Sequence, residues 1–158
     1  MDNEIYVRKA IEVARRSREN GNHPFGAILV GADGTVLLEA ENAVPAQNDC
    51  TMHAETRLVS MASRAYSREE LRACTLYSSA EPCAMCSGAI YWSGIGRVVY
   101  GLAESSLLAL TGSDPENPTL DLPCRDVFAH GQREIEVLGP LLEDEASDVH
   151  VGFWNSPD

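Results

Sequence analysis

Two short motifs constrain the fold of this chain more than any other feature, because each stands where a helix is expected to begin. The first reads HAE at residues 53–55, and the second reads EPCAMC at residues 81–86. The two cysteines are three residues apart and share one face of a helical turn, whereas the histidine and the glutamate point to different sides of theirs. All four side chains can meet only beyond the helix ends. The fold must therefore bring two helix N-termini to one site.

These residue types suit a zinc site with an open coordination position. His53, Cys83 and Cys86 can supply three ligands, which leaves the fourth position of a tetrahedral zinc for water. A helix N-terminus favours the thiolate form that binds zinc. Zinc can lower the pKa of its water to about 7, and Glu55 is then free to carry protons from water to substrate. The H-x-E…P-C-x-x-C pattern is the signature of the zinc deaminases.

Two other interpretations of the same residues remain open. Cys50 stands three residues before His53 and could close a structural Cys3His zinc site. That interpretation leaves Glu55 without a role. The two cysteines of EPCAMC could also form a redox dithiol, but this ignores the HAE motif. The catalytic site is favoured because it uses all four residues.

Length and composition predict one compact domain over residues 1–158, and the two motifs make it a zinc-dependent deaminase domain. Apolar residues make up 44% of the chain, but they form no run long enough to span a membrane. Residues 1–20 lack the apolar block of a signal peptide, so a cytoplasmic location is expected. Five cysteines are an odd number for a disulfide framework and fit metal ligands plus buried thiols, the latter being Cys74 and Cys124.

The charge of the chain disfavours a nucleic-acid partner. The formal net charge is −12, and Lys9 is the only lysine. No Lys or Arg follows Arg133, whereas the segment after it is rich in Asp and Glu. Phosphate binding requires clustered basic residues.

The hydrophobic pattern predicts strands that alternate with helices after a first hairpin. A first helix is expected to end near Asn20, and two further helices begin at His53 and Cys83. Residues 111–123 hold three prolines and are interpreted as a long loop. These elements predict a three-layer α/β/α sandwich around a mixed sheet. The expected strands are residues 25–30, 35–41, 74–80, 97–101 and 134–139, and the expected later helices are residues 124–131 and 141–150.

Several segments together resemble the cytidine deaminase-like superfamily. They are HPFGAILV (23–30), Asn42, MHAE (52–55) and EPCAMCSGAIYW (81–92), and they look most like bacterial guanine deaminases. They also resemble tRNA adenosine deaminases and fungal-type cytosine deaminases. The resemblance implies a five-stranded mixed sheet between helices and a homodimer.

The resemblance also implies roles for single residues. It implies that His53, Cys83 and Cys86 bind zinc and that Glu55 is the proton shuttle. It also implies that Asn42 forms a hydrogen bond with a ring nitrogen or carbonyl of the substrate. The chain departs from the family pattern before the HAE motif, where Asp-Pro-Thr-Ala is replaced by DCTM at residues 49–52. The loop after Leu110 and residues 134–158 follow the family only loosely.

The candidate substrate contacts each have a second interpretation. Phe25 and Trp92 are either pocket walls or packing residues. Phe153 and Trp154 either cover the site or only anchor the tail. Asp114 could accept a hydrogen bond from guanine or be a solvated loop residue, and Glu143 has the same two readings. His23, His130 and His150 are expected to be surface or capping residues. The full set of candidate substrate contacts is Asn42, Phe25, Ala54, Trp92, Asp114, Phe153 and Trp154.

The predicted function is hydrolytic deamination of a free nucleobase, with guanine converted to xanthine and ammonia. The alternatives are another small amino-heterocycle, such as cytosine, a nucleoside, an aminated triazine or a pterin, and adenosine in tRNA. A non-enzymatic zinc-stabilised module remains open only if Cys50 closes the metal site. The expected partners are a small heterocyclic base, water and a second copy of the chain.

Overall fold

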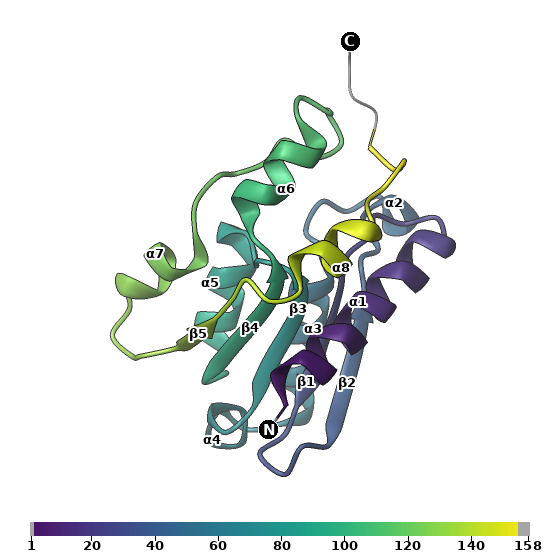
Figure 1. The fold of residues 1–158 in the computed structure, drawn as a ribbon. Coiled ribbons are helices and arrows are strands. Elements are labelled where there is room, and N and C mark those ends of the chain that lie inside the picture. Colours follow the sequence, from purple (N-terminus) through teal and green to yellow (C-terminus); the bar gives the residue numbers. More distant parts are fainter. Residues whose placement is uncertain (1, 155–158) are drawn as a thin grey trace.

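A five-stranded mixed sheet forms the centre of the computed structural model, which describes residues 2–154 (Figure 1). The strand order is β2-β1-β3-β4-β5. β1 pairs antiparallel with β2 and β3, whereas β4 lies parallel to both β3 and β5. This confirms the predicted mixed sheet. The strands are β1 (Gly26–Val30), β2 (Val36–Glu41), β3 (Thr75–Ala80), β4 (Arg97–Leu102) and β5 (Glu136–Leu138).

Helices cover both faces of the sheet and complete the three layers (Figure 1). α1 and α8 pack on one face, and α3, α5 and α7 lie on the other. The long helices are α1 (Asn3–Glu19), α3 (Ala54–Ala65), α5 (Ala84–Ser93) and α6 (Glu104–Thr111), and the short ones are α2 (Val44–Gln47), α4 (Arg68–Arg72), α7 (Cys124–Ala129) and α8 (Glu143–Asp148).

The central strands divide their side chains between two apolar cores. Ala27 and Leu29 of β1 face the α3 and α5 layer, whereas Ile28 and Val30 face α1. Alternate residues of a strand point to opposite faces, so a strand covered on both sides is apolar throughout. Gly26 permits the close approach of α1, because a Cβ at this position would lie 2.4 Å from the backbone nitrogen of Ala14.

Three helices were not predicted from the sequence. α2 and α4 fall in segments expected to be irregular, and α6 occupies residues directly before the predicted loop. β5 is also shorter than the predicted strand at 134–139. The loop predicted at residues 111–123 is confirmed from residue 112 onward, since Thr111 still belongs to α6 and residues 112–123 contain no helix or strand.

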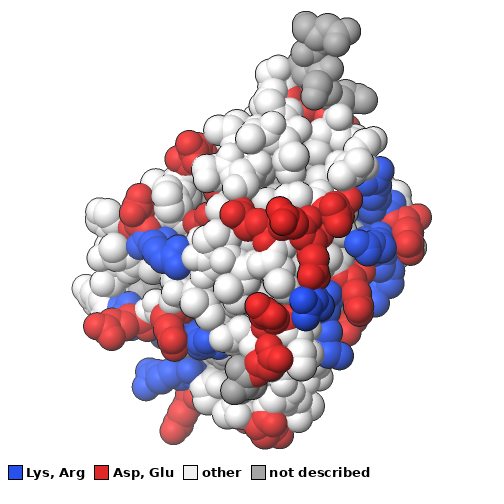
Figure 2. All heavy atoms as spheres, in the orientation of Figure 1, with Lys and Arg blue, Asp and Glu red and all other residues white. Residues whose placement is uncertain are grey.

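The surface is strongly acidic over α8. Figure 2 shows acidic side chains gathered over this helix, whose first turn holds Glu143, Asp144 and Glu145. No helix among residues 2–154 has the length and apolar character needed to cross a membrane.

Candidate active site

Both predicted helices begin at the same site. His53 is the N-cap residue of α3 and Cys83 is the N-cap residue of α5. Neither side chain makes the hydrogen bond that usually caps a helix. Both are therefore available as ligands, at the positive ends of two helix dipoles.

The spacing of three ligand atoms fits a tetrahedral zinc ion. His53 Nδ1 lies 3.6 Å from Cys83 Sγ and 3.5 Å from Cys86 Sγ, and the two sulfurs are 3.6 Å apart. Zinc bonds of about 2.3 Å to sulfur and about 2.0 Å to nitrogen place tetrahedral ligands about 3.5–3.8 Å from one another. The donor set and its geometry thus fit zinc, and two of the three ligands can be thiolates.

Cys50 does not join this group. Among residues 2–154, the cluster able to hold a metal consists of His53, Cys83 and Cys86. Cys50 is exposed and lines the neighbouring cavity. Three ligands leave one position open, which is the arrangement of catalytic zinc sites and not of closed structural ones.

The electrostatics of the site suit proton transfer. Glu55 is buried in the first turn of α3, and this burial raises the pKa of its carboxyl to about 7. A group with such a pKa can both accept and release a proton near neutral pH. Hydrogen bonds that link the Cys83 sulfur to Cys86 and to His53 lower the pKa of Cys83 to about 4. Cys83 is therefore a thiolate, as zinc binding requires.

A cavity of about 310 Å³ opens beside the ligand group. His53, Glu55 and Cys83 form one part of its wall. The far wall comes from the loop before α7, through residues Glu116 to Leu120. The other polar side chains of the wall are His23, Asn42, Cys50, Glu81 and Glu104.

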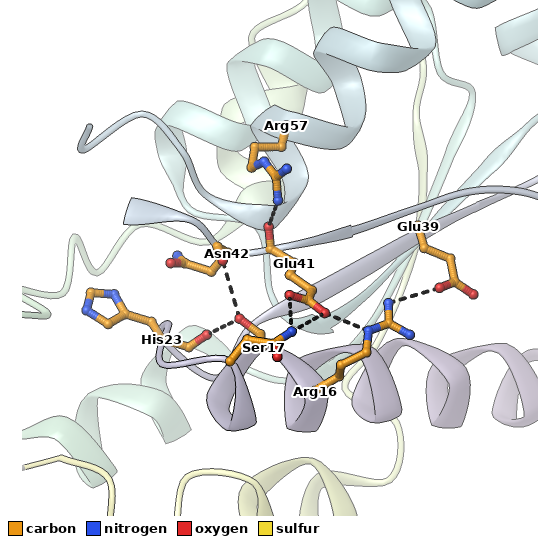
Figure 3. Close-up of polar contacts among 8 residues, drawn as sticks. Arg16, Ser17, His23, Glu39, Glu41, Asn42 and Arg57 are labelled. Carbon is orange, nitrogen blue, oxygen red and sulfur yellow. Dashed lines mark hydrogen bonds and ion pairs between the residues drawn. The ribbon is translucent and has the colours of Figure 1, made fainter. Parts of the chain in front are cut away.

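A buried hydroxyl holds two of these wall residues (Figure 3). Ser17 Oγ lies 2.7 Å from the main-chain oxygen of His23 and 3.4 Å from that of Asn42. The main-chain oxygen of Glu41, the residue before Asn42, accepts a hydrogen bond from the Arg57 side chain at 2.6 Å. In Figure 3 the side chains of His23 and Asn42 extend to the same side of this network. The network therefore fixes the backbone of His23 and Asn42, from which both side chains extend to the cavity.

The predicted substrate contacts are only partly brought together. Asn42 and Phe25 line the cavity. Ala54 is fully buried at the start of α3, and Asp114 is buried in the loop, but neither is among the lining residues. Trp92 is 70% exposed near the end of α5 and also lies outside the lining.

The C-terminal aromatic residues pack behind the cavity wall. The ring of Trp154 lies 5.5 Å from that of His23 and 6.0 Å from that of Phe25, and Phe153 also contacts His23. Trp154 Nε1 donates to His150 Nδ1 at 3.0 Å. Neither Phe153 nor Trp154 lines the cavity itself. Among the described residues they support the wall through His23 and Phe25.

Sequence reasoning misplaced two histidines and missed three carboxylates. His23 and His150 are buried and were wrongly expected at the surface, whereas His130 is exposed. His23 Nε2 lies 3.0 Å from Glu116 Oε2, so a hydrogen bond joins the segment before β1 to the loop. Glu81, Glu104 and Glu116 line the cavity but were not among the candidates. The length of the proline-rich loop was the signal that could have pointed to Glu116.

The fold, the group of three zinc ligands and the cavity beside it define a zinc-dependent hydrolytic deaminase of the class that acts on nucleobases and nucleosides. Residues 1–102 match the family model described as "Cytidine and deoxycytidylate deaminase zinc-binding region", and the chain belongs to this family.

Relatives of several specificities share this chain's sequence and fold. A probable cytosine deaminase of Schizosaccharomyces pombe is 47% identical over 95% of this chain and 91% of its own length. The guanine deaminase of Bacillus subtilis is 38% identical over 72% of each chain. A solved structure from a study of tRNA:A34 deaminases superposes with a TM-score of 0.72 at 30% identity, over 92% of this chain and 99% of the other.

The chain's own residues account for the proton transfers of hydrolytic deamination. The reaction replaces a C–NH2 bond by C=O, consumes one water and releases ammonia. Zinc, when bound to His53, Cys83 and Cys86, supplies a Lewis acid that makes a water molecule acidic near neutral pH. Glu55 lies in the cavity wall beside His53 and Cys83, and we propose that it takes a proton from the attacking water and delivers protons to the ring nitrogen and the leaving amine.

Proposed function

We propose that this deaminase acts on a free aminated nucleobase. The observation that carries the proposal is the size of the cavity, about 310 Å³, with Glu55 and two predicted zinc ligands in its wall. This volume lies at the lower end of the range of about 300–1,000 Å³ for small-molecule sites. The loop through Glu116 and Asn117 narrows the space in front of the ligands.

Asn42 supplies a hydrogen-bond donor for the base. Its side-chain oxygen accepts the backbone N–H of Val44 at 3.0 Å. The amide NH2 is then the part of this side chain left for the cavity. Asn42 therefore suits a base with a carbonyl oxygen or an unprotonated ring nitrogen beside the reacting carbon.

Cytosine is the first candidate base. The support is the 47% identity to a probable cytosine deaminase, which extends over nearly the full length of both chains. Guanine, expected from the sequence, is the second candidate. It is supported by the guanine deaminase relative and by the Pro24-Phe25 pair, whose aromatic ring lines the cavity.

A nucleic-acid substrate fits this chain poorly, although a tRNA:A34 deaminase shares its fold. Glu55, Glu81, Glu104 and Glu116 all line the cavity, and the chain carries a net charge of −12. A phosphate backbone requires clustered basic side chains, and no Lys or Arg among residues 2–154 lines the cavity. We therefore infer that the substrate is a small molecule.

Ammonia release from a panel of cytosine, guanine, adenine, their nucleosides and a tRNA tests this proposal. Turnover of cytosine or guanine, with slower turnover of the nucleosides, is expected. Activity on tRNA without activity on any free base would contradict it.

We also propose a homodimer formed through α5. Trp92 and Met85 are large apolar side chains that this helix exposes. They lie seven residues apart, on one face of the helix. A second copy of the chain would bury both. Analytical ultracentrifugation tests this arrangement. We expect the unaltered chain to sediment as a dimer and the Trp92→Glu variant to sediment as a monomer.

A cytoplasmic location fits the thiols. All five cysteines are free, and three of them are buried. Free thiols persist in a reducing compartment. We therefore place the enzyme in the cytoplasm, and fractionation of cells that express it is the direct test.

Removing the aromatic end of the chain is expected to raise KM for the free base by about tenfold. Phe153 and Trp154 contact His23 and Phe25, and aromatic pairs contribute about 0.5–1.5 kcal/mol each. Steady-state kinetics of a chain ending at Gly152 measures the effect. A chain ending at Trp154 is the control. An unchanged KM in the shorter chain would reduce the pair to surface packing.

A further inference from the structure

Glu104 is a buried carboxyl that the mechanism does not use. It begins α6, is only 5% exposed, and lines the cavity together with Glu55 and Cys83. No side chain or backbone N–H among residues 2–154 donates a hydrogen bond to its carboxyl. A buried carboxyl without a protein partner, facing a ligand cavity, is suited to receive a donor from the ligand.

The backbone around Glu104 is fixed by two other carboxylates. The N–H of Glu104 donates to Glu81 Oε1 at 2.9 Å, and the N–H of Ala103 donates to Glu143 Oε2 at 3.1 Å. The second oxygen of Glu81 accepts the N–H of Cys124 at 2.8 Å, which ties α7 to the same point. The start of α6 is therefore held in place, and the Glu104 side chain is presented from a rigid position.

The position of Glu104 is unfavourable for the protein without a ligand. Burial disfavours the charged form of the Glu104 carboxyl and raises its pKa. Removing a polar group from water without a hydrogen-bond partner destabilises the folded state. Such destabilising groups are typical of functional sites, where binding offsets their cost.

We propose that Glu104 is a specificity-determining residue that accepts a hydrogen bond from a ring N–H or amino group of the substrate base. This inference rests on the proposed function and adds the chemical class of the ligand. With the Asn42 amide as donor and Glu104 as acceptor, the cavity selects an uncharged aminated heterocycle that presents both an acceptor and an N–H. Glu116 at the loop adds negative charge, which disfavours phosphorylated forms.

Direct binding in an inactive background tests the inference. Zinc-loaded Glu55→Gln protein is titrated calorimetrically with cytosine and with guanine, alone and combined with Glu104→Gln or Glu104→Ala. Gln keeps an acceptor oxygen, whereas Ala removes it. We expect Kd to rise about tenfold with Gln and about 100-fold with Ala. Glu145→Gln is the matched control, because this exposed carboxylate pairs with Arg8 far from the cavity lining.

Thermal unfolding without a base separates a binding role from a structural one. A ligand-binding Glu104 predicts a higher Tm for Glu104→Gln than for the parent, together with weaker binding. A lower Tm, or Kd values within twofold of the parent for both variants, would overturn the inference while the proposed function stands. If neither base binds even with Glu104 intact, and the active chain releases no ammonia from them, the proposed function itself fails.

Discussion

Glu55→Gln is expected to lower kcat by about 10³-fold while the zinc content stays unchanged. Glu55 lies in the cavity wall beside His53 and Cys83 but is not part of the ligand group. Gln has nearly the same shape but cannot carry a proton, and general acid–base groups contribute about 10²–10⁴-fold to rate. Ammonia release and metal analysis of the same sample measure both effects.

Glu136→Gln is a matched control for this variant, because Glu136 is largely exposed on the edge strand β5 and pairs with Arg97. It should have the kinetics of the unaltered chain. Near-normal turnover by the Glu55→Gln enzyme would show that another group moves the protons.

Cys86→Ala is expected to abolish turnover by removing zinc. Cys86 is fully buried, and its sulfur completes the three-ligand group with His53 and Cys83. Changes to groups that only support a ligand already weaken metal binding by about 10–100-fold, so loss of a direct ligand should weaken it by more than about 100-fold. Zinc per chain after dialysis measures the loss.

Cys50→Ala is the matched control for Cys86→Ala, and it also separates a catalytic site from a structural one. Cys50 is exposed and lies outside the ligand group. Its removal should leave zinc content and Tm unchanged. A loss of zinc or of stability would mean that Cys50 closes a Cys3His site, and the catalytic account would then be wrong.

Much of the fold could be predicted because the central strands and long helices carry regular patterns. β1 and β3 are buried along their whole length, as expected for strands covered on both faces. α6 was missed because its buried face holds Glu104, Leu107 and Thr111, so polar residues interrupt the apolar period. Glu104, a residue that lines the cavity, is therefore one reason why the apolar pattern did not predict this helix.

α4 shows that a local signal was available and was not used. Ser67 and Glu70 form a capping box, and their S-x-x-E spacing is visible in the sequence. The helix has only five residues and contributes a single buried side chain, Leu71. Short helices of this kind are defined by their caps, because they have too few turns to show a hydrophobic period.

The metal ligands could be predicted because their chemistry depends on residue type and local spacing. His53, Cys83 and Cys86 each lie at or near a helix start, and the structure brings them together. The rest of the cavity could not be predicted, because it is built by long-range contacts. His23 meets Glu116 across the cavity, and Trp154 packs on Phe25 from the far end of the chain.

The most direct test of the central claim is ammonia release from cytosine and guanine as zinc is returned to the metal-free protein. The account predicts turnover of at least one of these bases, rising in proportion to bound zinc and reaching its maximum at one zinc per chain. X-ray absorption should then show two sulfurs and one imidazole nitrogen from His53, Cys83 and Cys86. Full activity without zinc, or stoichiometric zinc binding without release of ammonia from either base, would contradict the account.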